Sequence, residues 1–247
     1  MSVLIDRRDG VVEITLNRPQ KRNAMTDEMW AQMEEHLASI DPAAGDRVLV
    51  ITGAGEAFCG GSDVDGLLDD LPSLPDRIDV SNRCVLGVRA LPIPTLAKVD
   101  GIAAGSALNM ALACDLVFAS DRARFAQLFV HIGLSLDSGA SWLLPRLVGE
   151  RKARELSLLG EQVSATDALA IGMISKVVPH TELADTVTQV AIRLAGFNPA
   201  ALAGTKKMLN RAWEIELAEA LRAETENQVE VIQTDRAREL IGRFTRR

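Results

Sequence analysis

Two glycine-rich turns are the first features of this chain whose residue types suggest chemistry. Residues 53–62 and residues 101–106 each follow a short apolar run, and each is expected to lead into a helix. Backbone N–H groups at a helix start have no intrahelical partner, so they can bind an anion or the oxyanion of a reaction intermediate. Tight turns that need a positive φ explain the same glycines. Neither turn fits the dinucleotide or phosphate-loop pattern, which excludes those two kinds of site.

A single carboxylate, Asp137, lies between Leu136 and Ser138 in a segment, residues 101–149, that contains few other acids. An apolar pocket of Phe129, Leu134 and Leu136 would raise its pKa and make it a general base, as in other sites where burial tunes an acid. Aspartate is also favoured as a helix N-cap, and Ser138 and Gly139 suit a helix start. The residues alone leave both interpretations open.

Composition limits the class of protein. The chain has 247 residues, a formal net charge of −7 and three cysteines. Without a basic tract it lacks the electrostatic footprint of a nucleic-acid-binding protein. No apolar run reaches the ~18 residues of a membrane span, and the N-terminus has charges where a signal peptide is apolar. The odd cysteine count, without metal-like spacing, predicts free thiols, no metal site and a cytoplasmic location.

Strands and helices alternate along the first part of the chain. A hairpin is expected around Asp9-Gly10, a helix from Thr26, and a second helix over residues 81–90. Short, wholly apolar runs at residues 48–52, 95–99 and 115–119 predict buried parallel strands, and this alternation predicts an α/β fold. Further helices and one short strand follow residue 150. A boundary near Gly196 predicts an α/β body, residues 1–196, and a helical tail, residues 197–247.

Four motifs stand in a characteristic order: NRPQKRNAMTDEM, VLVITGAGEAFCGGSD, IPTLAKVDGIAAGSALNMALACDL, and the run ARF…IGL…LPRLVG. Their order and spacing resemble the enoyl-CoA hydratase/isomerase (crotonase) superfamily. The resemblance implies a spiral of ββα turns whose C-terminal helical region packs trimers, giving a homotrimer or a dimer of trimers. It also implies an acyl-CoA thioester as substrate, with CoA as part of the substrate and no further cofactor. It is less specific for the reaction, because one fold hosts several.

The resemblance assigns roles to individual positions. The backbone N–H groups of Ser62 and Ser106 would hold the thioester oxygen, at positions where family members usually have Ala and Gly. The positions that would border CoA are Lys21, Arg22, Ala24 and Ser62, with Phe244 reaching it from a neighbouring subunit.

The two glutamates that hydratases of this family use correspond to Asn109 and Phe129, which are expected to lie in the substrate pocket but can serve as neither acid nor base. Water addition needs two such groups, so standard hydration is not expected. The segment around Asp137 is similar to dienoyl-CoA isomerases and most of all to 1,2-epoxyphenylacetyl-CoA isomerases. The resemblance therefore implies an acyl-CoA isomerase with Asp137 as acid and base. The alternatives are another reaction of the family, such as thioester hydrolysis or C–C cleavage, and a CoA-ester binding protein with little turnover.

Three further residues have two interpretations each. On a strand, His131 would share a face with Phe129, where it would shuttle a proton or simply hold the structure together. Trp142 would either wall the acyl pocket or pack against its neighbours. Asp63 is expected to cap a helix rather than to react.

Overall fold

The fold begins with the expected hairpin, at the N-terminal end of a computed structural model that describes residues 1–245. Strand β1 (Val3–Arg8) pairs antiparallel with β2 (Val11–Leu16). Asp9 and Gly10 between them have φ angles of 52° and 80°. Two consecutive positive φ values define the hairpin turn that matches the twist of paired strands. The prediction of a hairpin at Asp9-Gly10 is confirmed.

The hairpin forms one edge of a six-stranded sheet. The strand order is β1-β2-β3-β4-β6-β9, and every pair from β2 onward is parallel. The remaining strands are β3 (Val48–Gly53), β4 (Thr95–Val99), β6 (Leu116–Ser120) and β9 (Lys176–Val178). The three apolar runs predicted as buried strands are β3, β4 and β6, because a parallel strand covered on both faces needs apolar residues throughout.

A second, three-stranded sheet explains the spiral. It has the order β5-β7-β8, formed by β5 (Ile102–Ala104), β7 (Arg124–Ala126) and β8 (Val163–Ser164). Strand β4 passes directly into β5 and helix α3 (Gly105–Ala113), and β6 passes into β7 and the helical segments after it. A bridge between Cys59 and Ala103 adds the segment after β3 to the same layer. Each turn of chain thus places one strand in each sheet, as the expected ββα spiral requires.

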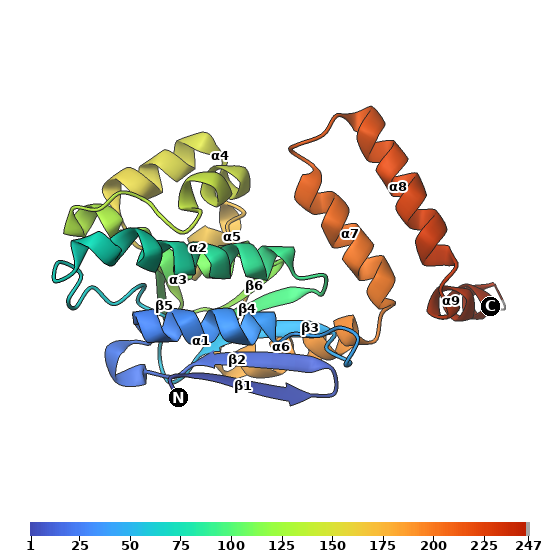
Figure 1. Ribbon diagram of the computed structural model, residues 1–247, viewed down its shortest axis with the longest axis horizontal. Coiled ribbons are helices and arrows are strands. Elements are labelled where there is room, and N and C mark those ends of the chain that lie inside the picture. The colour runs from blue at the N-terminus through green and yellow to red at the C-terminus, as the bar shows by residue number, and fades with distance from the viewer. Residues whose placement is uncertain (246–247) are drawn as a thin grey trace.

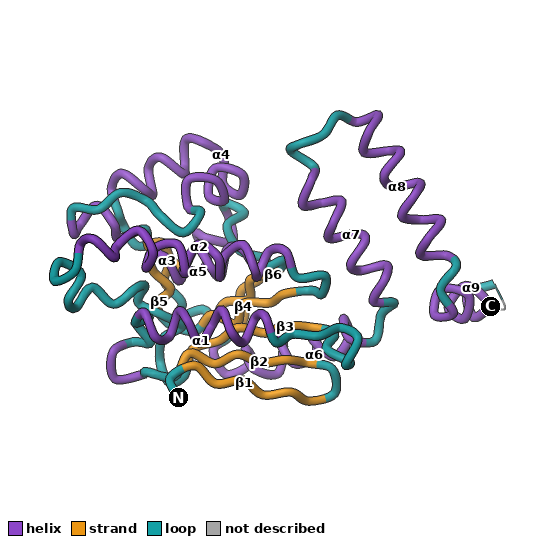
Figure 2. The backbone as a smooth tube through the Cα atoms, in the orientation of Figure 1, coloured by secondary structure: helices purple, strands orange, loops and turns teal. Residues whose placement is uncertain are grey.

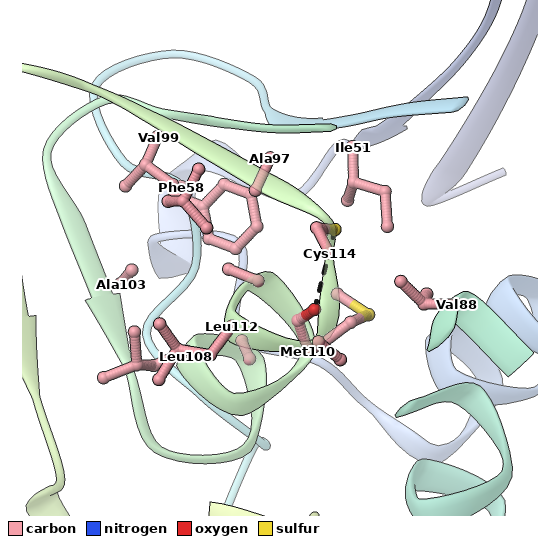
Figure 3. Close-up of a cluster of buried hydrophobic side chains, with 14 of the residues drawn as sticks. Ile51, Phe58, Val88, Ala97, Val99, Ala103, Leu108, Met110, Leu112 and Cys114 are labelled. Carbon is pink, nitrogen blue, oxygen red and sulfur yellow. Dashed lines mark hydrogen bonds between the residues drawn. The ribbon is translucent and has the colours of Figure 1, made fainter. Parts of the chain in front are cut away.

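Helices cover both faces of the six-stranded sheet (Figure 1). On one face, α1 (Asp27–Ala38), α2 (Leu74–Ala90) and α3 pack over side chains such as Ile51 and Ala97. Figure 3 shows this cluster, in which Phe58, Leu108 and Met110 fill the space between sheet and helices. On the other face, α6 (Leu183–Ala195) packs against a smaller cluster that includes Val48 and Phe118. The larger cluster is the one that supports the two glycine-rich turns.

Two expected helix boundaries were wrong. Helix α2 begins at Leu74, seven residues before the expected start, with a proline in its first turn. The first glycine-rich turn does not lead into a helix: residues 63–70 form turns, followed by the 3-10 helix η2 (Leu71–Ser73) (Figure 2). The chain from residue 140 to residue 159 is one long element, α4 (Ala140–Leu159), which Gly149 kinks with a φ of 77°.

The C-terminal helices extend away from the body (Figure 1). They are α7 (Pro199–Arg211), α8 (Leu217–Ile232) and α9 (Asp235–Phe244), and the short helix α5 (Ala165–Ala170) belongs to the body. Buried Lys206 ties α7 to the body by an ion pair of 2.8 Å with Asp115 and a hydrogen bond of 3.1 Å to the Ile93 carbonyl. Large apolar side chains on the tail are exposed, among them Trp213 and Leu217. A division at residue 196 stays a prediction.

Over residues 1–245, no helix combines the length and the apolar character that crossing a membrane requires.

Candidate active site

The two glycine-rich turns meet at a cavity of about 650 Å³. Trp30 of α1, Ile78 of α2 and the aromatic ring of Phe129 line it together with residues of both turns. Asp137 lines the same cavity between Leu134 and Leu136. The apolar surroundings expected for Asp137 are therefore confirmed, and the turns and the carboxylate face one space.

The first turn needs glycine at position 61. Gly61 has a φ of 108°, and a Cβ atom there would lie 3.2 Å from the carbonyl oxygen of Ala104. Its own carbonyl accepts a hydrogen bond of 2.8 Å from the amide of Met25. Glycine accepts such a φ at no steric cost, whereas other residues rarely do. The close approach of the two turns thus fixes the position of Ser62, the next residue.

The second turn brings Ser106 against Ser62. Gly105, with a φ of 53°, begins α3, so the Ser106 amide belongs to the first helical turn and has no intrahelical partner. The Ser62 amide donates a hydrogen bond of 3.1 Å to the Ser106 hydroxyl. The two hydroxyl oxygens are 2.7 Å apart. The structure therefore brings together the two residues that the sequence predicted would hold a thioester oxygen.

The Asp137 carboxylate has an unusual environment. Its Oδ1 atom is buried and finds no hydrogen-bond partner among the described residues. Burial raises the pKa of this carboxyl above its ordinary value, and a hydrogen bond with Ser138 offsets part of that increase. An unpaired buried carboxylate is costly unless something binds to it, which makes Asp137 a candidate proton acceptor.

The alternative interpretation of Asp137 as a helix cap is wrong. Gly139 is the N-cap of α4, and no side chain caps this helix. Ser138 and Gly139 have φ angles of 49° and 81°, so a left-handed turn separates Asp137 from the helix start. The Ser138 hydroxyl is buried against the Ser81 hydroxyl of α2, at 3.2 Å. This contact joins the left-handed turn to α2, next to the Asp137 side chain that lines the cavity.

Asn109 lies behind the cavity wall, not in it. Its side chain is fully buried and donates a hydrogen bond of 3.0 Å to the backbone carbonyl of Asp137. Its Oδ1 atom accepts one of 2.7 Å from Gln127. The expectation that Asn109 contacts the substrate is corrected: the residue at the first glutamate position anchors the backbone that carries the carboxylate. Phe129, at the second position, does line the cavity.

His131 and Trp142 have different places from those expected. His131 belongs to the 3-10 helix η3 (Leu128–Ile132), so the argument from a shared strand face was wrong. It lines the cavity, and its Nε2 atom is 3.0 Å from the carbonyl oxygen of Gly160. Trp142 does not line the cavity; its ring packs between the guanidinium groups of Arg89 and Arg146, at 4.6 and 3.9 Å. The packing alternative therefore describes Trp142.

Of the residues expected to border CoA, Ser62 lines the cavity, whereas Lys21, Arg22 and Ala24 do not. Lys21 forms an exposed ion pair of 3.1 Å with Asp65, and the carbonyl of Arg22 accepts a hydrogen bond of 2.9 Å from the Gly60 amide. Ala24 follows in the same loop, one residue before the bridge between Met25 and Ser62. A role in binding CoA stays a prediction for all three positions.

Phe244 is the last residue of α9, its side chain is 82% exposed, and it is not among the residues that line the cavity. A contact with CoA would have to come from another subunit, as the sequence analysis supposed.

Asp63 does not cap a helix, because none follows it. Its carboxylate pairs with Arg18 at 2.5 Å and accepts a hydrogen bond from the Asp65 amide.

Cys59 is a buried thiol whose pKa burial raises to about 12, so it is not a thiolate nucleophile. Within residues 1–245, no three His, Cys, Asp or Glu side chains gather as ligands for a metal.

Sequence reasoning missed three side chains at the cavity. Trp30 donates from its indole nitrogen to the Ser62 hydroxyl at 3.1 Å. Arg77 and Ser81 are four residues apart and so share a face of α2. Arg77 lines the cavity and pairs with Asp27 at 2.7 Å. The spacing of Arg77 and Ser81 would have predicted that both face the cavity if the helix had been expected to begin before residue 77.

Comparison with known proteins extends over nearly the whole chain. The family model for enoyl-CoA hydratase/isomerase matches residues 6–247. A 1,2-epoxyphenylacetyl-CoA isomerase from Escherichia coli strain K12 is 40% identical over 208 residues, which are 82% of this chain and 79% of that protein.

Two solved structures agree in fold. An enoyl-CoA hydratase from Bacillus anthracis superposes with a TM-score of 0.95 at 27% identity, covering 100% of this chain and 96% of that one. A protein from Thermobifida fusca, solved in complex with acetoacetyl-CoA, gives a TM-score of 0.87 at 29% identity, covering 93% of this chain and 94% of the other. The expected fold class is confirmed. These similar proteins include both an isomerase and a hydratase.

Proposed function

Because this chain belongs to the enoyl-CoA hydratase/isomerase family, we propose that it is an acyl-CoA isomerase that moves a proton along the acyl group of a thioester, with Asp137 as acid and base. The coarser statement, an enzyme of this family that processes acyl-CoA, follows from membership itself. The finer one, isomerisation, depends on the chemistry of the cavity.

One observation carries the proposal: one oxygen of the Asp137 carboxylate is buried at the cavity without a partner among the described residues, while both glutamate positions of a hydratase hold residues that are not acids. Asn109 is occupied in two hydrogen bonds behind the wall, and Phe129 presents a ring. A site of this kind supports transfer of a proton from one carbon to another more readily than the addition of water.

The proton transfer can be written with this chain's own groups. The Asp137 carboxylate takes a proton from a saturated carbon next to the thioester carbonyl or next to a double bond that is conjugated with it. The electron pair of that C–H bond moves into the conjugated system and makes the thioester oxygen an enolate. The backbone N–H groups of Ser62 and Ser106 hold this oxygen, and one such donor typically contributes ~2.7–4 kcal/mol in a transition state. The protonated carboxyl then returns the proton to a different carbon, which shifts the double bond and consumes no water.

The apolar surroundings of Asp137 suit this cycle. Burial raises the carboxyl pKa, which makes the ionised form a stronger base towards a C–H bond. No cofactor beyond the CoA of the substrate enters the scheme.

The test is a panel of enoyl-CoA and dienoyl-CoA esters of different chain lengths, followed by chromatography of the products. Isomerised thioesters without free CoA support the proposal. Release of free CoA favours hydrolysis or C–C cleavage instead. Tight binding of every ester with no product favours the binding-protein alternative.

Restoring a glutamate at position 109 is not expected to create a hydratase. Asn109→Glu places a longer, acceptor-only side chain in a fully buried position that now donates to the Asp137 carbonyl. Overpacking of a buried position typically costs ~1–3 kcal/mol, so the melting temperature should fall. The second glutamate position remains Phe129, so water still lacks its second group. Crotonyl-CoA hydration, followed by the loss of enoyl absorbance, should not rise; substantial hydration by this variant would contradict the division of roles proposed here.

We expect the enzyme to be a homotrimer or a dimer of trimers. The C-terminal helices expose large apolar side chains, including Trp213 at 73%, Leu217 at 73% and Phe244 at 82%. Exposed apolar surface of this extent usually marks a protein–protein contact. Sedimentation at micromolar concentration should give a trimer or hexamer, whereas a monomer would contradict this expectation.

A further inference from the structure

We propose that the side-chain hydroxyl of Ser106 is a third hydrogen-bond donor to the thioester oxygen, oriented by a chain of hydrogen bonds that runs from Trp30 through Ser62. The inference rests on the proposed function, because it concerns the same thioester oxygen. It differs from the backbone contacts already described, which any residue at positions 62 and 106 would provide.

The chain of hydrogen bonds has a fixed direction at Trp30, and either hydroxyl can donate in the step between Ser62 and Ser106. The indole nitrogen of Trp30 is only a donor, so the Ser62 hydroxyl accepts from it, at 3.1 Å. The Ser62 hydroxyl then has its own hydrogen to donate, and the Ser106 oxygen is its neighbour at 2.7 Å. The Ser106 oxygen also accepts from the Ser62 amide, at 3.1 Å. With both of its accepting positions filled, the Ser106 hydroxyl has one hydrogen left to donate.

An acceptor in the cavity selects this direction. Ser106 lines the cavity, and the hydrogen on its oxygen has no other acceptor in the chain of contacts just described. If the two hydroxyls pointed the other way, the free hydrogen would lie on Ser62 instead. A thioester oxygen beside the two backbone amides would favour the arrangement in which Ser106 donates, because that adds one hydrogen bond to the developing negative charge.

Burial makes the arrangement effective. Trp30 and Ser106, at the two ends of this chain of hydrogen bonds, are each only 2% exposed, whereas Ser62 between them is exposed at the cavity. Hydrogen bonds in such an environment are stronger than in water, and each polarises the next. The indole N–H therefore strengthens the Ser62 hydroxyl as a donor, which in turn strengthens the Ser106 hydroxyl.

The Ser62 amide locates the thioester oxygen. The acceptor for this amide is the Ser106 oxygen. The same amide is one of the two expected to hold the thioester oxygen. A thioester oxygen that accepts from this amide would therefore lie beside the Ser106 hydroxyl, which can donate to it.

A purely obstructive hydroxyl would have the opposite effect. If Ser106 only competed for the Ser62 amide, its removal would free that amide and improve binding and turnover. Removal of a donor, by contrast, lowers kcat and kcat/KM together, since the lost interaction strengthens only as negative charge develops. The sign of the effect therefore separates the two roles.

The experiment compares Ser106→Ala with the wild-type enzyme, and with Ser157→Ala as a control for the loss of a buried serine hydroxyl elsewhere, in α4. We expect kcat to fall by about 10-fold or more in Ser106→Ala, but by less than the ~10²–10³ typical of losing one oxyanion-hole donor, because the two backbone donors remain. The KM of Ser106→Ala should stay near the wild-type value, and so should both kcat and KM of Ser157→Ala. Ser62→Ala breaks the series of hydrogen bonds but keeps the backbone amide, so its kcat should fall less than that of Ser106→Ala. The fold-decrease in kcat of the double variant should be smaller than the product of the two single decreases, because the two residues act as one unit.

A second measurement does not depend on turnover. The infrared carbonyl stretch of a ¹³C-labelled saturated acyl-CoA, which cannot isomerise, should shift to lower frequency on binding wild-type enzyme and shift less on binding Ser106→Ala. Binding with an unchanged band, or faster turnover by Ser106→Ala, would overturn this inference alone. Failure of the wild-type enzyme to bind any acyl-CoA would overturn the proposed function, and this inference with it.

Discussion

Asp137→Asn is expected to abolish most of the isomerase activity while leaving the fold and the affinity for CoA esters intact. The substitution keeps the size of the side chain and removes its ability to take a proton. A positioned general base is commonly worth ~10²–10⁴ in rate, so kcat should fall within that range. The measurement is turnover, ligand affinity and melting temperature on one preparation of each protein.

The stability of the variant provides an internal control. Burial raises the folded-state pKa of Asp137 above its value in the unfolded chain. The neutral carboxyl therefore makes its whole contribution to the free energy of unfolding below the unfolded-state pKa of ~3.9. This contribution is lost as the pH rises through the folded-state pKa. At neutral pH the ionised carboxylate is a cost to the fold, which Asn avoids. Asp137→Asn should be at least as stable as wild type at pH 7, so its loss of activity will not reflect unfolding.

The pH profile gives the same variant a second readout. Only the ionised carboxylate accepts a proton, so kcat/KM of the wild-type enzyme should rise with pH through an ionisation above the ordinary range of aspartate. This rise should be missing from the residual activity of Asp137→Asn. Full activity in a well-folded variant would remove Asp137 from the mechanism and leave His131 as the next residue to test.

Gly61→Ala is expected to have the second-largest effect, by displacing the Ser62 amide. The new Cβ atom would lie 3.2 Å from the carbonyl oxygen of Ala104, in the turn that carries Gly105 and Ser106. Relief of this contact moves both donors of the oxyanion site. Loss of one such donor typically costs ~10²–10³ in kcat, and we expect a decrease of at least that size, measured on the best substrate of the panel.

Gly45→Ala is a matched control. Gly45 has a φ of 113°, close to the 108° of Gly61, but no atom lies within 4 Å of a Cβ placed there. Both variants should lose roughly 1–3 kcal/mol of stability from the strained backbone. Only Gly61→Ala should lose turnover. Equal activity of the two variants would mean that the position of the Ser62 amide does not matter for the reaction.

The main elements of the fold could be predicted because their signals are local. Strands β3, β4 and β6 are continuous apolar runs, which parallel strands buried on both faces require. The smaller sheet gave no such signal, since β8 has only two residues and β5 and β7 have three each, too few for a periodic pattern. The start of α2 was missed because Arg77 faces the cavity and interrupts the apolar stripe.

Some features of the candidate site could likewise be predicted from the sequence, and others could not. Asp137 and the two glycine-rich turns could be identified from residue type and order along the chain. The hydrogen bonds from Asn109 to the Asp137 carbonyl and from Ser62 to Ser106 could not, because they join residues 28 and 44 positions apart and depend on how the turns of the spiral stack. The sequence therefore identified the carboxylate but not what holds it in place.

The central claim is that the enzyme moves a proton and adds no water, and isotope labelling tests this most directly. An active enoyl-CoA or dienoyl-CoA ester is incubated with the enzyme in D₂O that also contains ¹⁸O, and the thioester product is analysed by mass spectrometry. The account predicts an isomer with the mass of the substrate plus deuterium at the exchanged carbons, no ¹⁸O, and loss of this exchange in Asp137→Asn. A hydroxyacyl-CoA that carries ¹⁸O, formed as fast as the wild-type enzyme consumes its substrate, would contradict it.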